Sequence, residues 1–257
     1  MVFGKRLLMF LLIIILLGIL AYYYPYLTGN ATNNQQQTNY QKEPAFVTKV
    51  IDGDTIKAEI DGTEYSIRLL GINTPEKGMP YSKEAVKFLK SLEEKNVELL
   101  RDKENTDRYN RKLRYVFYKE NLINAEILQK GLATSFMLNE LKYETKLKDA
   151  ENFAIKNKIG IWKESGEVCA FCVELSELNP ENEYFIIKNS CDFSCNLTGW
   201  VVKDDANHFF YLAYIGAFEE LRYNSKIDIW NNEGDRFFMR DNNGDLVIFW
   251  EYVNKTL

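Results

Sequence analysis

The first 44 residues divide into an apolar run and a polar segment. Residues 7–24 contain no charged side chain and follow Lys5 and Arg6. This length is just sufficient to span a bilayer, and the preceding basic residues predict a cytoplasmic N-terminus with the rest of the chain across the membrane. Residues 1–27 are therefore expected to form a transmembrane anchor or a signal peptide; a run longer than the usual signal core of about 7–15 residues favours the anchor. Residues 28–44, rich in Asn and Gln, predict a flexible linker.

Residues 45–166 carry strand patterns followed by helix patterns. Alternation of apolar and polar residues predicts strands over residues 46–60, 64–72, 97–101 and 114–118. Asp61 and Gly62 separate the first two and are typical of a tight hairpin. Apolar positions at helical spacing predict helices over residues 81–92, 122–129 and 140–158, with Gly131 and Gly160 as stops. A small sheet followed by helices predicts an α+β domain.

Residues 167–257 show a different pattern, with short strands and frequent turns. The strands are expected over residues 184–188, 200–203, 209–212, 227–230, 236–240 and 246–252. Turns rich in Asn, Asp and Gly separate them, and this regular spacing predicts an all-β sandwich.

The net charge of −5 hides an uneven distribution. Residues 45–166 carry 22 basic and 20 acidic side chains, whereas residues 167–257 carry 7 and 16. The acidic C-terminal part is therefore a poor candidate for holding nucleic acid by itself.

The first hairpin concentrates charged side chains between apolar positions. Asp52 and Asp54 are two residues apart, so an extended chain would place both carboxylates on one side, where they suit a hard cation. Arg68 supplies a planar guanidinium that matches a phosphate. Glu76 follows Pro75, whose fixed φ stiffens the turn that presents the carboxylate. These residue types together indicate metal-assisted phosphodiester hydrolysis, although Asp-Gly-Asp is also common in plain turns.

A charged segment, residues 106–111, lies between two predicted strands. Its composition alone is typical of a surface loop. A sharper interpretation brings Arg111 to the phosphate as a second guanidinium, with Arg108 and Tyr109 near the nucleotide.

Four blocks of the sequence resemble the signature blocks of the staphylococcal nuclease (thermonuclease) family, in the same order and at similar spacing. They are residues 50–55, 68–76, 106–111 and 124–133. The resemblance covers residues 46–162. It implies an OB-type five-stranded β-barrel with three helices and Ca²⁺-dependent cleavage of DNA or RNA.

The resemblance also implies a metal site. Asp54 would bind Ca²⁺ directly, Thr74 would offer its backbone carbonyl, and Asp52 would lie behind them. Where the family usually has a second metal-binding Asp, this chain has Asn73. An amide oxygen still coordinates Ca²⁺, but one negative charge is lost, so we expect weaker binding. Extracellular Ca²⁺ is far more concentrated than cytosolic Ca²⁺, so a weak site outside the cell would still fill.

In the same resemblance, Glu76 acts as the base toward the attacking water, and Arg68 and Arg111 hold the phosphate. Two guanidiniums and a divalent ion would neutralise the charge that builds on the pentacoordinate phosphorus. Residues 134–138 lack the tyrosines that line the family's nucleotide pocket. Base preference is therefore not implied.

Several phrases in the C-terminal part resemble the lamin-tail domain, an immunoglobulin-like sandwich. They are residues 183–189, 196–200, 230–235 and 241–247. Such sandwiches usually bind a partner or separate neighbouring domains, and they rarely catalyse reactions. The resemblance does not identify a ligand.

The cysteines gather where this C-terminal part begins. Cys169, Cys172, Cys191 and Cys195 have spacings that could bind Zn²⁺ through four thiolates. Two disulfides are the competing interpretation and fit an exported chain better, with the pairing left open. Either way, the role is structural.

The sequence therefore predicts a membrane-anchored or secreted nuclease, with a catalytic domain over residues 45–166 and a sandwich over residues 167–257. One alternative is a nuclease fold that has lost activity and binds nucleic acid. Asn73 favours this alternative, whereas the retained arginines and carboxylates oppose it. A second alternative is a surface interaction protein in which the sandwich binds the partner.

Overall fold

The computed structural model describes residues 41–137 and 140–253, which belong to one compact unit. The expected anchor, residues 1–27, and most of the expected linker, residues 28–44, lie outside these ranges. Within the described ranges, no helix has both the length and the apolar character needed to cross a membrane.

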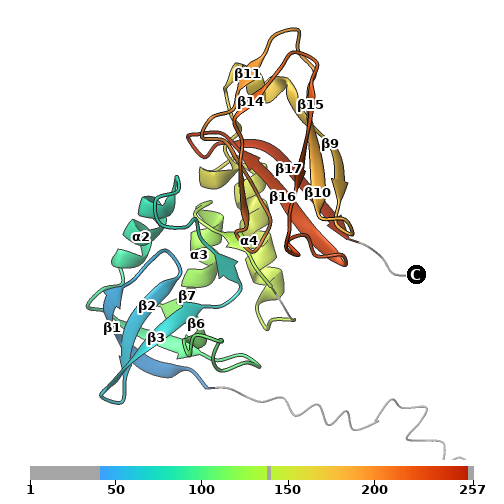
Figure 1. Ribbon diagram of the computed structural model, residues 1–257. Coiled ribbons are helices and arrows are strands. Elements are labelled where there is room, and N and C mark those ends of the chain that lie inside the picture. Colours follow the sequence, from blue (N-terminus) through green and yellow to red (C-terminus); the bar gives the residue numbers. More distant parts are fainter. Residues whose placement is uncertain (1–40, 138–139, 254–257) are drawn as a thin grey trace, which may run out of the picture. The chain divides into compact units, whose positions relative to one another are not determined.

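The first half of the described chain forms a closed β-barrel (Figure 1). Its strands are β1 (Glu43–Val50), β2 (Thr55–Ile60), β3 (Thr63–Leu69), β5 (Asn96–Leu100), β6 (Lys112–Tyr118) and the short β7 (Asn121–Leu122). Neighbouring strands run antiparallel in the order β3-β2-β1-β5-β6-β7, and a parallel pairing of β3 with β6 closes the barrel. The predicted OB-type barrel of five long strands is confirmed.

Three helices accompany the barrel, as predicted: α2 (Ser82–Lys90), α3 (Ile123–Gln129) and α4 (Glu144–Lys156). A small ladder of β4 (Ile72–Asn73) with β8 (Thr134–Ser135) lies beside them. Helix α2 buries Ala85 and Leu89, four residues apart on one face. Helix α4 begins four residues later than the pattern predicted.

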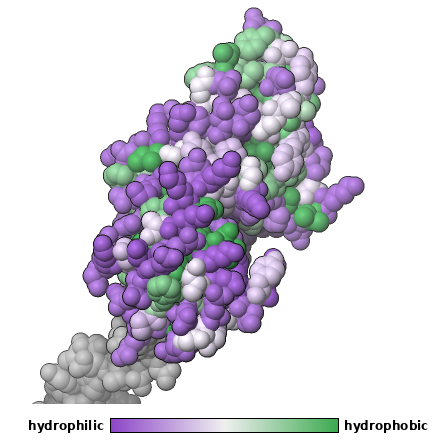
Figure 2. All heavy atoms as spheres, turned by 90° about the vertical axis from the view of Figure 1, so that its left-hand side faces the viewer, coloured by the Kyte–Doolittle hydropathy of each residue, from purple (hydrophilic) through white to green (hydrophobic). Residues whose placement is uncertain are grey.

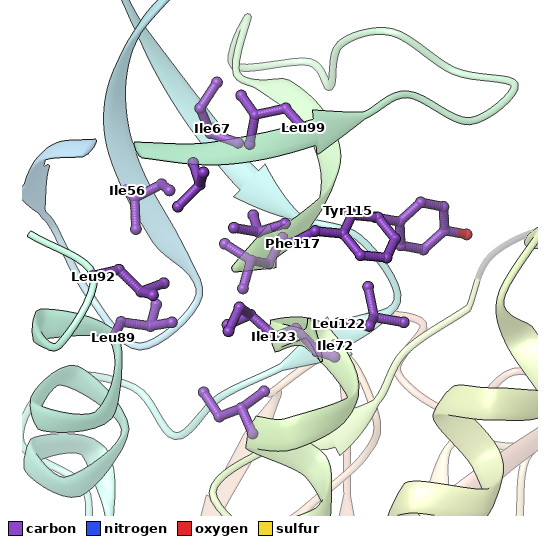
Figure 3. Close-up of a cluster of buried hydrophobic side chains, with 14 of the residues drawn as sticks. Ile56, Ile67, Ile72, Leu89, Leu92, Leu99, Tyr115, Phe117, Leu122 and Ile123 are labelled. Atoms are coloured by element: carbon purple, nitrogen blue, oxygen red, sulfur yellow. The ribbon is translucent and has the colours of Figure 1, made fainter. Parts of the chain in front are cut away.

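The barrel and its helices enclose a hydrophobic core (Figure 3). Figure 3 shows Ile56, Ile67 and Leu99 from three strands together with Leu89 from α2. The buried Tyr115 hydroxyl donates to Asp102 Oδ2 at 2.6 Å, so its polar end is satisfied. The face drawn in Figure 2 is mainly hydrophilic, with hydrophobic residues in small separate groups.

The second half of the described chain contains the expected β-sheets. One sheet holds β9 (Val173–Asn179), β10 (Tyr184–Asn189) and β15 (Glu220–Asn224); another holds β12 (Val201–Lys203), β13 (Phe209–Tyr211), β16 (Gly234–Arg240) and β17 (Leu246–Val253). A short pair, β11 (Cys195–Asn196) and β14 (Tyr214–Ile215), adds to them. Phe185 of β10 contacts Phe237 of β16 at 5.3 Å between ring centroids, so the two larger sheets share one core. The lamin-tail resemblance stays a prediction.

Three predicted strands are wrong in detail. The strand predicted over residues 64–72 ends at Leu69, because the chain turns at residues 70–71 before β4. Residues 46–60 form two strands rather than one, because the chain turns at residues 51–54 between β1 and β2. Residues 227–230 form no strand, because the Ile229 and Trp230 N–H groups donate to the Glu183 carboxylate instead of to a neighbouring strand.

The cysteines form two disulfides, Cys169–Cys195 and Cys172–Cys191. The disulfide interpretation is therefore confirmed over the zinc alternative. Cys169 lies in a short 3-10 helix, η2 (Val168–Phe171), and Cys172 directly follows this helix. Their partners lie within β11 (Cys195) and shortly before it (Cys191).

The two halves are joined by apolar and backbone contacts. Trp162, from η1 (Gly160–Trp162), contacts Phe249 of β17 with ring centroids 5.3 Å apart and belongs to a buried cluster with Phe238. The Leu246 N–H donates to the Lys163 carbonyl, and the Ser165 N–H donates to the Leu246 carbonyl. Residues 163–165 are thus joined by backbone hydrogen bonds to the first residue of β17.

Two glycines allow the ends of α3 and α4 to meet. Gly131 and Gly160 have φ of +60° and +59°. A Cβ on Gly131 would lie 1.9 Å from the Ile159 carbonyl oxygen, and one on Gly160 would lie 2.1 Å from the Gly131 carbonyl oxygen. The predicted helix stops are therefore also a contact that only glycine permits.

We expect Gly131→Ala to lower the free energy of unfolding by clearly more than Gly62→Ala. Gly62 also has positive φ, +77°, but a Cβ there meets nothing within 4 Å. The control should therefore lose only the conformational cost, about 1–2 kcal/mol, whereas Gly131→Ala adds a clash with backbone. Urea unfolding of both variants measures the difference, and equal losses would contradict the contact argument.

Candidate active site

A tight turn between β1 and β2 carries the two predicted carboxylates. The Ile51 and Asp52 N–H groups both donate to the Thr55 carbonyl, and the Asp54 N–H donates to Asp52 Oδ1 at 3.0 Å. The chain bends here, so the expected extended backbone is wrong, but the Asp52 and Asp54 carboxylates still lie close to each other, as expected. A Cβ on Gly53 would lie 2.6 Å from Thr74 Oγ1, so glycine lets this turn approach the chain after β4.

Asp54 is the central carboxylate of the site. It is buried, and its Oδ2 accepts from the Thr74 N–H at 3.1 Å and from Thr74 Oγ1 at 3.0 Å. Arg68 Nη2 lies 3.2 Å from the same oxygen. These bonds fix the carboxylate between β3 and the chain after β4. The structure thus brings together Asp54, Thr74 and Arg68, which the sequence placed in one site.

Asp52 lies in the same turn. Burial raises the pKa of the Asp52 carboxyl above its usual value, and the neighbouring Asp54 carboxylate raises it further. Crowding of two carboxylates favours an added positive charge at the turn.

The two predicted phosphate-binding arginines meet at one end of the barrel. Arg68 lies opposite Thr55 in the β2–β3 pairing, and its Nη1 donates to the Leu69 carbonyl at 3.0 Å. Arg111 precedes β6; its Nε contacts Asp107 Oδ2 at 2.7 Å, and its Nη1 donates to Thr55 Oγ1 at 3.2 Å. A guanidinium has five N–H donors, more than these bonds with described residues use. Both side chains can therefore also donate to a phosphate.

The segment before β6 also carries an exposed aromatic ring. Tyr109 is 65% exposed, and the Arg108 and Arg111 guanidiniums lie 4.8 and 5.5 Å from its ring centroid. An exposed ring beside an arginine that is a candidate phosphate ligand suits base stacking. Contact of Arg108 and Tyr109 with a nucleotide stays a prediction.

A loop of the sandwich, residues 204–208 between β12 and β13, also reaches the site. Glu76 is exposed, and its Oε1 accepts from Asn207 Nδ2 at 3.1 Å. Asn73 Nδ2 donates to the Asp205 carbonyl at 3.0 Å, while Asn73 Oδ1 accepts from Arg68 Nη2 at 3.3 Å. Sequence reasoning missed Asn207, because nothing local relates it to a residue 131 positions earlier.

A buried ion network holds this loop in place. Arg236 of β16 contacts Glu151 of α4 at 3.0 Å through Nη1 and donates from Nε to the Asp205 carboxylate at 2.8 Å. The same guanidinium donates to the Ser135 carbonyl. The loop is therefore fixed to the barrel side through α4 and β8.

The oxygen donors in and near the turn are of the type that a hard cation prefers. They are the Asp54 and Asp52 carboxylates, the Asn73 amide oxygen and the Thr74 carbonyl, and Ca²⁺ prefers such ligands. Within residues 41–137 and 140–253, however, no group of three or more His, Cys, Asp or Glu side chains could hold a metal ion. The weak Ca²⁺ site expected from Asn73 stays a prediction.

A closed OB-type barrel with paired arginines and carboxylates at one end defines a class of nucleases. A family model described as "Staphylococcal nuclease homologue" matches residues 66–164. The chain is 33% identical over 153 residues to the thermonuclease of Staphylococcus intermedius, covering 56% of this chain and 91% of that protein. These matches show that the chain belongs to the staphylococcal nuclease family.

Other relatives agree. The chain is 36% identical over 146 residues to the thermonuclease of Staphylococcus hyicus, covering 54% of this chain and 83% of that protein. It is 30% identical over 130 residues to an uncharacterized endonuclease of Haemophilus influenzae, covering 50% and 71%.

We expect Asp52→Asn to stabilise the protein at about pH 8 in the presence of a chelator. The folded state raises the pKa of Asp52, so stability is lost as pH rises through that raised pKa, and a neutral amide avoids the loss. The gain should shrink as the pH falls and vanish by about pH 2–3, below the ordinary Asp pKa of about 3.9, where the carboxyl is protonated in both the folded and the unfolded state. Urea unfolding at both pH values tests this, with the exposed Asp228→Asn as control; a gain independent of pH would contradict it.

Proposed function

We propose that this protein is a Ca²⁺-dependent nuclease that hydrolyses phosphodiester bonds of DNA or RNA outside the cytoplasmic membrane. The observation that carries this proposal is the convergence of Arg68 and Arg111 on the Asp54–Thr55 segment. Glu76 belongs to the same site, since Asn207 Nδ2 lies 3.1 Å from Glu76 Oε1 and 3.5 Å from the Thr74 carbonyl.

The residues divide the chemistry among them. Glu76 takes a proton from a water whose oxygen attacks phosphorus. The bond from phosphorus to the leaving sugar oxygen breaks, that oxygen takes up a proton from solvent, and Glu76 releases its proton to solvent to complete the cycle. Arg68 and Arg111 donate N–H groups to the non-bridging oxygens and neutralise the charge that grows there. Ca²⁺ bound by Asp54, Asn73 and the Thr74 carbonyl, with Asp52 behind them, would supply Lewis-acid stabilisation of the same charge.

A location outside the cytoplasm is part of the proposal. The apolar run over residues 7–24 supports an anchor or a signal peptide. The two disulfides support an oxidising compartment, because such bonds are rare in the cytosol.

We expect Glu76→Gln to lower the rate of single-stranded DNA cleavage by about 10²–10⁴-fold, because the amide cannot accept the water's proton. The full chain with millimolar Ca²⁺ serves as reference, and Glu59→Gln, on an exposed position of β2, is the control. Fluorescence anisotropy should show that Glu76→Gln still binds the oligonucleotide. If the reference protein binds DNA but never cleaves it, the nucleic-acid-binding alternative replaces the nuclease.

We expect Asn73→Asp to lower the Ca²⁺ concentration for half-maximal cleavage by about tenfold, because a charged ligand holds Ca²⁺ more tightly than an amide. The same change removes the donor to the Asp205 carbonyl, so thermal stability without Ca²⁺ should fall. A Ca²⁺ titration of cleavage and a melting curve with chelator measure the two effects. An unchanged Ca²⁺ midpoint would show that residue 73 does not bind the metal.

A further inference from the structure

A cavity of about 270 Å³ lies where the barrel half meets the sandwich half. Asn73, Thr74 and Tyr81 line it from the barrel half; Phe209, Tyr211 and Arg240 line it from the sandwich. We call it the interface cavity. Most of its lining is apolar, with a few polar groups, as in sites that hold a flat organic ligand.

Two aromatic rings form one wall of the interface cavity. Phe209 and Tyr211 are two residues apart on β13, so their side chains lie on the same side of the strand. Their ring centroids are 6.4 Å apart with planes 28° apart, and Tyr211 is 69% exposed. Rings of this kind stack on nucleobases without requiring a particular sequence.

The lining carries charges of both signs. Lys203 and Arg240 bring positive charge, and the Asp241 carboxylate, which accepts from Ser165 Oγ at 2.6 Å, brings negative charge. The choice of a base as the occupant therefore rests on the two aromatic rings.

The interface cavity adjoins the candidate active site. Asn73 and Thr74 line the cavity and also belong to the proposed metal site. Asn207, which donates to Glu76, lines the cavity as well. A strand whose phosphate lies at Arg68 and Arg111 therefore places a neighbouring nucleoside at this opening.

We propose that the interface cavity binds a nucleobase next to the scissile phosphate, stacked on Phe209 and Tyr211. This inference rests on the proposed nuclease function. It assigns the sandwich a direct part in holding the substrate strand, which its net acidic charge did not suggest.

Binding is tested in the full chain carrying Glu76→Gln, with a fluorescent single-stranded oligonucleotide and with versions in which one base at a time is removed. Loss of base stacking in Tyr211→Ala should raise the Kd by about 5- to 150-fold. Tyr211→Phe should bind normally. Tyr214→Ala is the matched control, because Tyr214 is an exposed tyrosine of the sandwich outside the cavity lining.

Removing the base that occupies the cavity should raise the Kd of the protein that keeps Tyr211. The same removal should not raise the Kd of Tyr211→Ala any further, because both changes delete the same contact. If Tyr211→Ala and Tyr214→Ala bind with equal Kd while the parent chain still cleaves DNA, the base-binding proposal is wrong and the proposed nuclease function stands. If binding depends on Tyr211 but the parent chain does not cleave DNA, the proposed nuclease function is wrong and the base-binding proposal stands.

Discussion

A buried guanidinium, that of Arg236, fixes the geometry on which the candidate active site depends. It lies between the Glu151 carboxylate on α4 and the Asp205 carboxylate in the sandwich loop. Removing one partner of such a buried pair generally costs about 3–5 kcal/mol, because the remaining charge is left uncompensated. The loop that reaches Asn73 and Glu76 is therefore held from both halves of the described chain, and these two side chains contact a loop of fixed position.

Much of the barrel could be predicted from the sequence because its determinants are local. The Asp61-Gly62 turn, the alternation in β2 and β3, and the glycines after α3 and α4 each specify nearby backbone. The site residues that come from this half, Asp54, Arg68 and Arg111, meet as the family resemblance implied. Arg68 lies on β3, which pairs with both β2 and β6, and Asp54 and Arg111 directly precede these two strands.

The rest depends on contacts that no local pattern contains. The turn at residues 51–54 is stabilised by the Asp52 side chain bonding the Asp54 N–H, which alternation of side chains does not reveal. The contacts of Asn207 and Asp205 join segments more than 130 residues apart. One signal was present: Glu151 lies on the buried stripe of α4 between Leu147 and Ala154, and a carboxylate there requires a buried partner.

The backbone pairing of Leu246 with residues 163–165 has a consequence for how such a protein can change during evolution. This pairing, the Trp162 cluster and the Glu151–Arg236 contact make the outer surface of the barrel complementary to one particular neighbour. A gene rearrangement that exchanged the sandwich for an unrelated module would leave an apolar face and a buried carboxylate without partners. In this chain, changes on one side of the joint should therefore be tolerated only when the other side changes to match.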